Sequence, residues 1–223
     1  MELKQIADEM QPRTEAARDW VFKIIRTAIV RGVLPGGMPL RQDEISAALK
    51  VSHIPIREAF RQLEAQGLVR IYHNRGAVVT KLTQHELENV MDTRIMLEIG
   101  AFKTAIPLMT EADTQHAQEL LNMFQAERNP QRYDTLNLQF HFALYSPCNN
   151  DVALSMIDQL HANSDRYLRP YYPKEDDSAF KAIEEHQALI DACRKKNTEL
   201  ACAVLRTHLE STKTLLLTSP LLT

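Results

Sequence analysis

The segment from Val51 to Val79, VSHIPIREAFRQLEAQGLVRIYHNRGAVV, constrains the fold more than any other part of the chain. Ser52 is a favoured N-cap residue for a helix. Pro55 follows within the first turn, where its missing N–H costs little. The spacing of the apolar residues predicts a helix with one buried face, which ends at Gly67. The positions expected to be buried are Ile56, Ala59, Phe60 and Leu63.

Two β-branched runs, LVRIY and AVVTKL, follow this helix and are joined by HNRG. They predict a two-stranded hairpin with a turn at residues 74–76. Upstream, EAARDWVFKIIRTAIVRG predicts an amphipathic helix that stops at Gly32, and RQDEISAALK predicts a second, short helix. Three helices followed by a hairpin are the layout of a winged helix-turn-helix, so we expect a winged domain over residues 1–82.

The N-terminal end of the third predicted helix carries the polar residues Ser52, His53 and Arg57. In a winged helix-turn-helix this end enters the major groove of DNA, where an arginine can contact guanine O6 and N7. The hairpin tip, with Asn74 and Arg75, would reach the DNA backbone or the minor groove. The pattern alone also fits a small helical domain with solvated charges at its edges.

The distribution of charge favours an anionic partner for the first part of the chain only. Residues 1–80 hold 12 Lys and Arg against 9 Asp and Glu, whereas the remaining residues hold 14 against 20. The sequence has no apolar run long enough to span a membrane and begins without the apolar core of a secretory signal. Three widely spaced cysteines, without a CxxC pair, favour a reduced, cytoplasmic protein.

The segment LPGGMPLRQDEISAALKVSHIPIREAFRQLEAQGLVRIYHNRGAVVTKL resembles the DNA-binding domain of the GntR family of bacterial transcription regulators. The resemblance implies a homodimer that binds double-stranded DNA at an inverted-repeat operator. Arg41 and Arg75 are candidate phosphate contacts, although a solvated charge at the helix end fits Arg41 equally well. Histidine at position 53, where the family usually has arginine, implies a changed half-site preference. The remaining positions implied at the DNA are Ser52, Ile54, Pro55 and Arg57 on the recognition helix and His73, Asn74 and Gly76 in the wing.

From residue 83 onward the chain reads as helices joined by short loops, so the expected fold is mainly α, with a C-terminal all-helical bundle over residues 83–223. The predicted helices are roughly 84–106, 111–127, 131–146, 151–169, 177–196 and 198–217.

Three histidines on separate predicted helices fall in line with apolar residues and should point into this bundle. Asn137 lies four residues before His141, and therefore on the same helical face. His186 and His208 lie on the last two helices. Hydrogen-bonded core histidines are one interpretation, and a site for a first-row divalent metal is the other. A metal-dependent hydrolase is a rival hypothesis, but no carboxylate stands at a spacing that suggests a general base, so we predict no catalytic residue and no enzyme.

The C-terminal half, with NLQFH and EEHQALIDACRKKNTELACAVLRTHL, resembles the FCD effector domain of the FadR-like branch of this family. The resemblance implies that Asn137, His141, His186 and His208 hold a divalent transition metal, zinc or nickel. Asparagine in place of the usual aspartate should lower the affinity. It further implies a small carboxylate effector near the metal, with Arg94 as the anion clamp, although a salt bridge from Arg94 to Glu98 is equally consistent with the sequence. A metal sensor, in which the ion itself is the signal, is the alternative.

Overall fold

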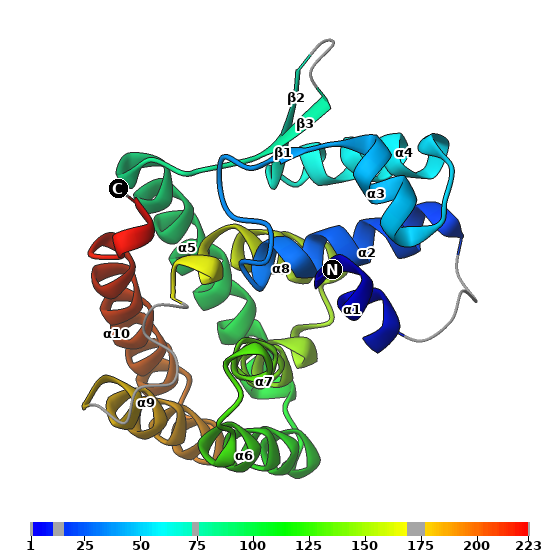
Figure 1. Cartoon of the computed structure of the whole chain (residues 1–223). Helices are drawn as coiled ribbons and strands as arrows, with labels where there is room; N and C mark the ends of the chain where they lie inside the picture. Colours follow the sequence, from blue (N-terminus) through cyan, green and yellow to red (C-terminus); the bar gives the residue numbers. More distant parts are fainter. Residues whose placement is uncertain (1, 11–15, 73–75, 169–176, 223) are drawn as a thin grey trace. The chain divides into compact units, whose positions relative to one another are not determined.

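The computed structural model describes residues 2–10, 16–72, 76–168 and 177–222 (Figure 1). The chain forms two compact units, Met1–Thr83 and Gln84–Thr223. Three residues predicted for the wing, His73, Asn74 and Arg75, lie outside the described residues.

The N-terminal unit packs its helices around the buried faces predicted from sequence. Its helices are α1 (Glu2–Glu9), α2 (Ala17–Val30), α3 (Gln42–Leu49) and α4 (His53–Ala65). Helix α4 packs on α2 and α3 and buries Ile56, Ala59, Phe60 and Leu63, as expected. Helix α1, which the sequence analysis did not anticipate, packs on α2 and α3 and buries Ile6.

The predicted hairpin is present, and a third, short strand joins it. The strands are β1 (Pro39–Leu40), β2 (Val69–Tyr72) and β3 (Gly76–Val79), antiparallel in the order β1-β3-β2. Gly76 has a φ of +77°, and a Cβ atom at this position would lie 3.1 Å from the carbonyl oxygen of Leu40. Glycine is therefore required where the wing re-enters the sheet.

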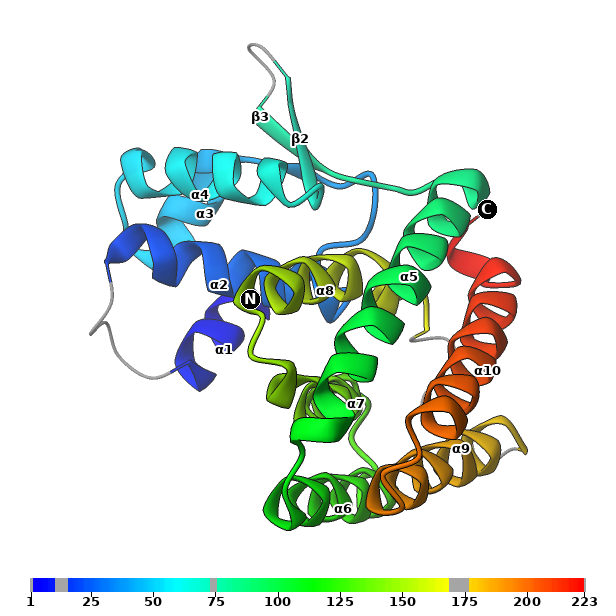
Figure 2. The same cartoon turned by 180° about the vertical axis from the view of Figure 1, so that it is seen from behind.

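The C-terminal unit is a bundle of the six predicted helices. These are α5 (Gln84–Leu108), α6 (Glu111–Ala126), α7 (Pro130–Tyr145), α8 (Asp151–Ser164), α9 (Asp177–Arg194) and α10 (Thr198–Leu217). Short 3₁₀ turns are η1 (Ser146–Cys148), η2 (Asp165–Tyr167) and η4 (Pro220–Leu222). Helix α10 runs alongside α5, and α6 packs on α7 and α9 (Figures 1 and 2).

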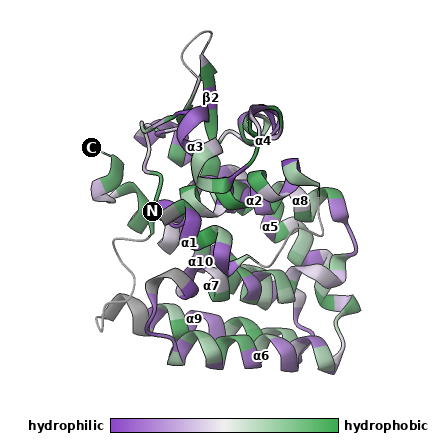
Figure 3. Cartoon of the chain, turned by 45° about the vertical axis from the view of Figure 1, so that its right-hand side comes forward, coloured by the Kyte–Doolittle hydropathy of each residue, from purple (hydrophilic) through white to green (hydrophobic). Residues whose placement is uncertain are grey.

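The helices of the bundle bury apolar faces around one core. Hydrophobic and hydrophilic residues alternate along them, as expected for helices with one buried side (Figure 3). Among the largest fully buried side chains of this core are Phe102, Phe124, Phe140 and Tyr145. The predicted architecture, a winged helix-turn-helix with an all-helical bundle, is confirmed. No helix in the described ranges combines the length and hydropathy that a membrane span requires.

Candidate functional site

The N-terminal end of α4 leaves the hydroxyl group of Ser52 without its usual intrahelical partner. Ser52 is the N-cap residue, with φ −71° and ψ 169°, but its side chain makes no capping hydrogen bond. An N-cap serine commonly accepts from the N–H of the second or third helical residue. Here the third residue is Pro55, which has no N–H. An exposed hydroxyl group therefore remains at the helix terminus, where backbone N–H groups and the helix dipole favour an anion.

The outer face of α4 presents an apolar residue and two arginines. Ile54 is 60% exposed, and Arg57 and Arg61 are exposed one helical turn apart. Sequence analysis missed Arg61, although its spacing of four from Arg57 places it on the same face. Such a face offers positive charge for phosphates or base edges.

Two other predicted DNA contacts, both exposed, lie beside exposed carboxylates within the N-terminal unit. His53 Nε2 lies 3.2 Å from a carboxylate oxygen of Asp43, and Arg41 lies 3.4 Å from Glu44. Because these groups are exposed, the pairs are weak and can exchange partners readily.

The three predicted histidines meet inside the C-terminal unit. His141 of α7, His186 of α9 and His208 of α10 each offer one ligand atom, and these atoms lie within 4.8 Å of one another. They line a cavity of about 70 Å³, which exceeds the volume that one water molecule needs. Asn137 and Arg94 also line this cavity. The helical stripes noted in the sequence therefore converge on one site.

Each histidine is held differently. His208 Nδ1 lies 2.7 Å from Glu185 Oε2, and His141 Nδ1 lies 3.3 Å from the hydroxyl oxygen of Tyr145. His186 is 1% exposed, and neither of its ring nitrogens has a hydrogen-bond partner among the described residues. Its ring packs instead against Phe140, with ring centroids 4.4 Å apart.

The protonation state of two of these rings, His141 and His186, suits a metal ion. Burial lowers the pKa of His141 well below the usual value, and the neighbouring His186 and His208 lower it further. Burial, with a smaller contribution from His208, likewise lowers the pKa of His186. Neutral imidazoles are good ligands for first-row divalent ions. A buried imidazole without a partner is costly unless a ligand satisfies it, so the orphaned nitrogens of His186 fit a divalent metal at this position.

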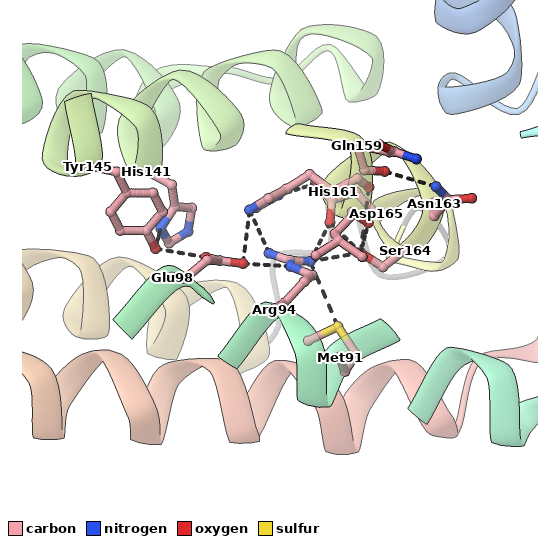
Figure 4. Close-up of polar contacts among 11 residues, drawn as sticks. Met91, Arg94, Glu98, His141, Tyr145, Gln159, His161, Asn163, Ser164 and Asp165 are labelled. Carbon is pink, nitrogen blue, oxygen red and sulfur yellow. Dashed lines mark hydrogen bonds and ion pairs between the residues drawn. The ribbon is translucent and has the colours of Figure 1, made fainter. Parts of the chain in front are cut away.

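A buried ionic network adjoins the histidine cavity (Figure 4). Arg94, which is 2% exposed, donates from Nε to Glu98 at 2.7 Å and from Nη1 to Asp165 at 2.8 Å. Nη1 also donates to Ser164, and Nη2 lies 2.8 Å from His161 Nε2. The second ring nitrogen of His161 lies 2.8 Å from Asp165. Glu98, which is fully buried, also accepts a hydrogen bond from Tyr145 at 2.8 Å.

The charged groups in this network shift one another's pKa values in favour of the ionised forms. Burial alone would raise the pKa of Glu98, but Arg94 and His161 hold it well below its usual range. For Asp165, burial is again outweighed, by His161 and then Arg94, and the pKa falls. Burial and Arg94 oppose charge on His161, yet Asp165 and Glu98 raise its pKa. Both carboxylates are therefore ionised at neutral pH, inside the protein.

These contacts bear on two of the sequence-based expectations. Arg94 lines the cavity, but it also forms the salt bridge to Glu98 that was the alternative interpretation. The sequence analysis found no carboxylate at a spacing that suggests a general base, but in the structure one carboxylate lies next to a cavity histidine. Glu185, one residue before His186, turns to His208 on the next helix.

Besides Glu185, the sequence analysis missed Tyr145, His161 and Asp165. The pairs His141–Tyr145 and His161–Asp165 share the spacing of four that also links Arg94 to Glu98, which is the signal that could have found them.

Comparison with known protein families gives one family match in each of the two units. Residues 18–79 match the family described as bacterial regulatory proteins, gntR family, and residues 89–211 match the FCD domain family. The chain is 30% identical over 186 residues to the "Probable D-xylose utilization operon transcriptional repressor" of Paenarthrobacter nicotinovorans, covering 81% of this chain and 80% of the relative.

Two further similarities extend over most of the chain. It is 24% identical over 200 residues to the HTH-type transcriptional repressor RspR of Escherichia coli strain K12, covering 88% of this chain and 87% of the relative. In fold it is similar to E. coli McbR/YncC, with a TM-score of 0.82 at 22% identity over 91% of this chain and 98% of the other.

Proposed function

This chain belongs to the GntR family of bacterial regulatory proteins and carries an FCD domain, and on that premise we propose that it is a transcriptional repressor controlled by a small ligand. It binds an inverted-repeat operator as a homodimer, and ligand binding in the helical bundle changes its affinity for DNA. Repression is proposed because the two curated relatives named above are described as repressors.

DNA recognition is assigned to the start of α4 and to the wing. Ser52, Ile54 and Arg57 are all exposed there, and the hydroxyl of Ser52 makes no capping hydrogen bond. We assign base reading to Arg57 and phosphate contacts to Ser52 and Arg61, with Arg41 and the wing residues adding backbone contacts. His53, with a single hydrogen-bonding nitrogen free to face DNA, reads a base less specifically than an arginine would.

A divalent metal at the histidine cavity is the second part of the proposal. The observation that carries it is His186, whose two ring nitrogens are buried without a hydrogen-bond partner among the described residues. His141, His186 and His208 would hold the ion, with Asn137 beside them on the cavity wall. A bound zinc or nickel ion would supply a Lewis-acidic position for an oxygen ligand. Asn137 brings no charge, so the affinity is lower than with an aspartate.

A small carboxylate is the proposed effector. The support is the guanidinium of Arg94 at the cavity wall. Because Arg94 is already paired with Glu98 and Asp165, an entering carboxylate reaches it only by displacing Asp165, and otherwise binds on the histidine side.

Helices α5 and α8 are the proposed contact between the two copies. They pack together and carry three strongly exposed apolar residues, Met96, Val152 and Met156. A Cβ atom added at Gly100, one turn after Met96, would meet no atom of the described residues within 4 Å outside its own stretch of helix, so a second helix can approach the backbone closely here. Light scattering should give a dimer mass for the native protein and a monomer mass for Met96→Glu. A dimer that is unchanged in this variant would move the contact elsewhere.

The test of the whole proposal begins with selecting binding sequences from a random DNA library. Selected sites should contain an inverted repeat, and affinity measured by fluorescence anisotropy should fall when a small carboxylate is added in the presence of zinc. His186→Ala should keep DNA affinity and lose the response. If no metabolite or metal alters DNA binding, the switching part of the proposal is wrong.

A metal sensor is the second candidate function, and the same orphaned His186 favours it. Elemental analysis of the purified protein, together with DNA affinity measured with and without zinc, separates the two. A response to zinc alone identifies the ion as the signal, whereas a response only to zinc with a carboxylate identifies an effector.

A further inference from the structure

The three cavity histidines differ in what their Nδ1 atoms contact. For His208 this contact is the carboxylate of Glu185, on the neighbouring helix α9, whose side chain is largely buried. A carboxylate accepts hydrogen bonds and does not donate them. His208 therefore carries a proton on Nδ1, and in the neutral ring the lone pair lies on Nε2.

For His141 the same result follows from a chain of two hydrogen bonds. The hydroxyl group of Tyr145 has one proton, and it donates this proton to Glu98 Oε2 at 2.8 Å. The tyrosine oxygen can then only accept from His141 Nδ1, which lies 3.3 Å away. His141 is thus also protonated on Nδ1, with Nε2 free.

Glu98 is a fixed acceptor because the rest of the buried network holds its other oxygen. Oε1 accepts from Arg94 Nε at 2.7 Å and lies 3.3 Å from His161 Nε2 (Figure 4). The side chain is fully buried, so water does not compete for it. The orientation of Tyr145 is therefore set by residues of α5 and α8.

We propose that Glu185, acting directly, and Glu98, acting through Tyr145, are positioning residues that lock His208 and His141 in the tautomer with Nε2 toward the cavity. His186 has no such partner among the described residues, so neither of its ring nitrogens is fixed as the metal ligand before a metal binds. This inference rests on the proposed function in one respect, namely that Nε2 of each locked ring is offered to a metal ion. Outer carboxylates that orient ligand histidines typically change metal affinity by about 10–100-fold.

The first experiment reads the tautomers in the metal-free, full-length protein. Long-range ¹H–¹⁵N spectra of ring-labelled protein distinguish Nδ1–H from Nε2–H for each histidine. We expect His141 and His208 to be Nδ1–H and His186 to be a mixture. A wild-type spectrum with either locked ring in the Nε2–H form overturns the proposal without any variant.

The second experiment compares variants with a matched control on the same helix. Glu185→Ala should convert His208 to a tautomer mixture, Glu185→Gln should restore Nδ1–H because its amide oxygen still accepts, and Tyr145→Phe should release His141. Glu184→Ala removes the adjacent, exposed carboxylate and should change neither ring. The His186 signals serve as an internal control in every variant.

Zinc affinity, measured by competition with a chelating dye, completes the test. Glu185→Ala and Tyr145→Phe should bind zinc about 10–100-fold more weakly, and Glu184→Ala should match the wild type. Wild-type affinity in both variants overturns the positioning role while leaving the metal proposal intact. If the wild type binds no zinc, the metal proposal fails, and the tautomer spectra still decide whether the rings are locked.

Discussion

Replacing Arg94 by methionine should destabilise the C-terminal unit far more than replacing an exposed arginine. The substitution leaves Glu98 and Asp165 buried without their permanent cation, at positions where the guanidinium now lies 2.7 and 2.8 Å away. Breaking a buried ion pair by removing one partner typically costs about 3–5 kcal/mol. Methionine fills much of the vacated volume, so the loss reports mainly the charge.

Protonation limits this cost and gives it a pH dependence. Starting from the usual glutamate pKa of 4.5, taking up a proton at pH 7 costs about 3.4 kcal/mol, because each pH unit is worth about 1.36 kcal/mol. At pH 5 the same step costs only about 0.7 kcal/mol. In the wild type, the pKa values of Glu98 and Asp165 are lower in the folded than in the unfolded state. Both groups therefore stabilise the fold at pH values above their unfolded-state pKa, and this stability is lost as the pH falls through their folded-state pKa. The difference between wild type and Arg94→Met should therefore shrink by about 2–3 kcal/mol from pH 7 to pH 5.

Urea unfolding followed by circular dichroism at 222 nm measures this difference. Arg206→Met is the control, because Arg206 also pairs at i,i+4, with Glu210 at 3.9 Å, but both side chains are more than half exposed. That variant should lose at most about 0.5 kcal/mol. If Arg94→Met loses no more than Arg206→Met at pH 7, or loses the same at pH 5 as at pH 7, the ionic description of the network is wrong.

Three further substitutions test other parts of the structure. Arg57→Ala should weaken binding to a selected operator by roughly 1–3 kcal/mol while leaving random DNA unaffected; equal losses on both would make Arg57 a phosphate contact. His186→Leu should stabilise the metal-free protein by about 1–2 kcal/mol, because it removes a buried polar group without a partner, and should abolish the rise in melting temperature with zinc. A destabilised variant would show that His186 is an ordinary core residue. Phe60→Ala should cost about 3–5 kcal/mol in urea unfolding followed by the fluorescence of Trp20, the single tryptophan, and a loss below 1 kcal/mol would contradict its place in the core.

The helices that sequence analysis predicted are those in which several apolar residues recur at helical spacing. In α4 these residues make one continuous face, and Ser52 and Gly67 mark the ends. Helix α1 lacked this signal because Ile6 is its only fully buried apolar residue. The strand β1 has two residues, and its pairing with β3 is a tertiary contact that no local pattern indicates.

The candidate site also contains residues that could be predicted from the sequence and residues that could not. The three histidines could be predicted because each lies in an apolar stripe of its own helix. Of their partners, Tyr145 stands four residues after His141 and could have been found. The contacts of Glu185 with His208 and of Tyr145 with Glu98 could not, since they join different helices. The sequence also offered Arg94 as either an anion clamp or a salt bridge to Glu98, and only the packing of α8 on α5 brings Asp165 to the same guanidinium.

The position at which helix α5 begins determines how a movement of this helix reaches the N-terminal unit. The first residue of α5, Gln84, is also the first residue of the C-terminal unit. Ten residues later, Arg94 joins the helix to the buried ionic network through its ion pair with Asp165. Ten residues of helix make an arm of about 15 Å, so a tilt of about 5° at Arg94 displaces the start of the helix by about 1.3 Å. Because Arg94 lines the cavity, a tilt of α5 at this residue would displace the point from which the chain continues into the N-terminal unit.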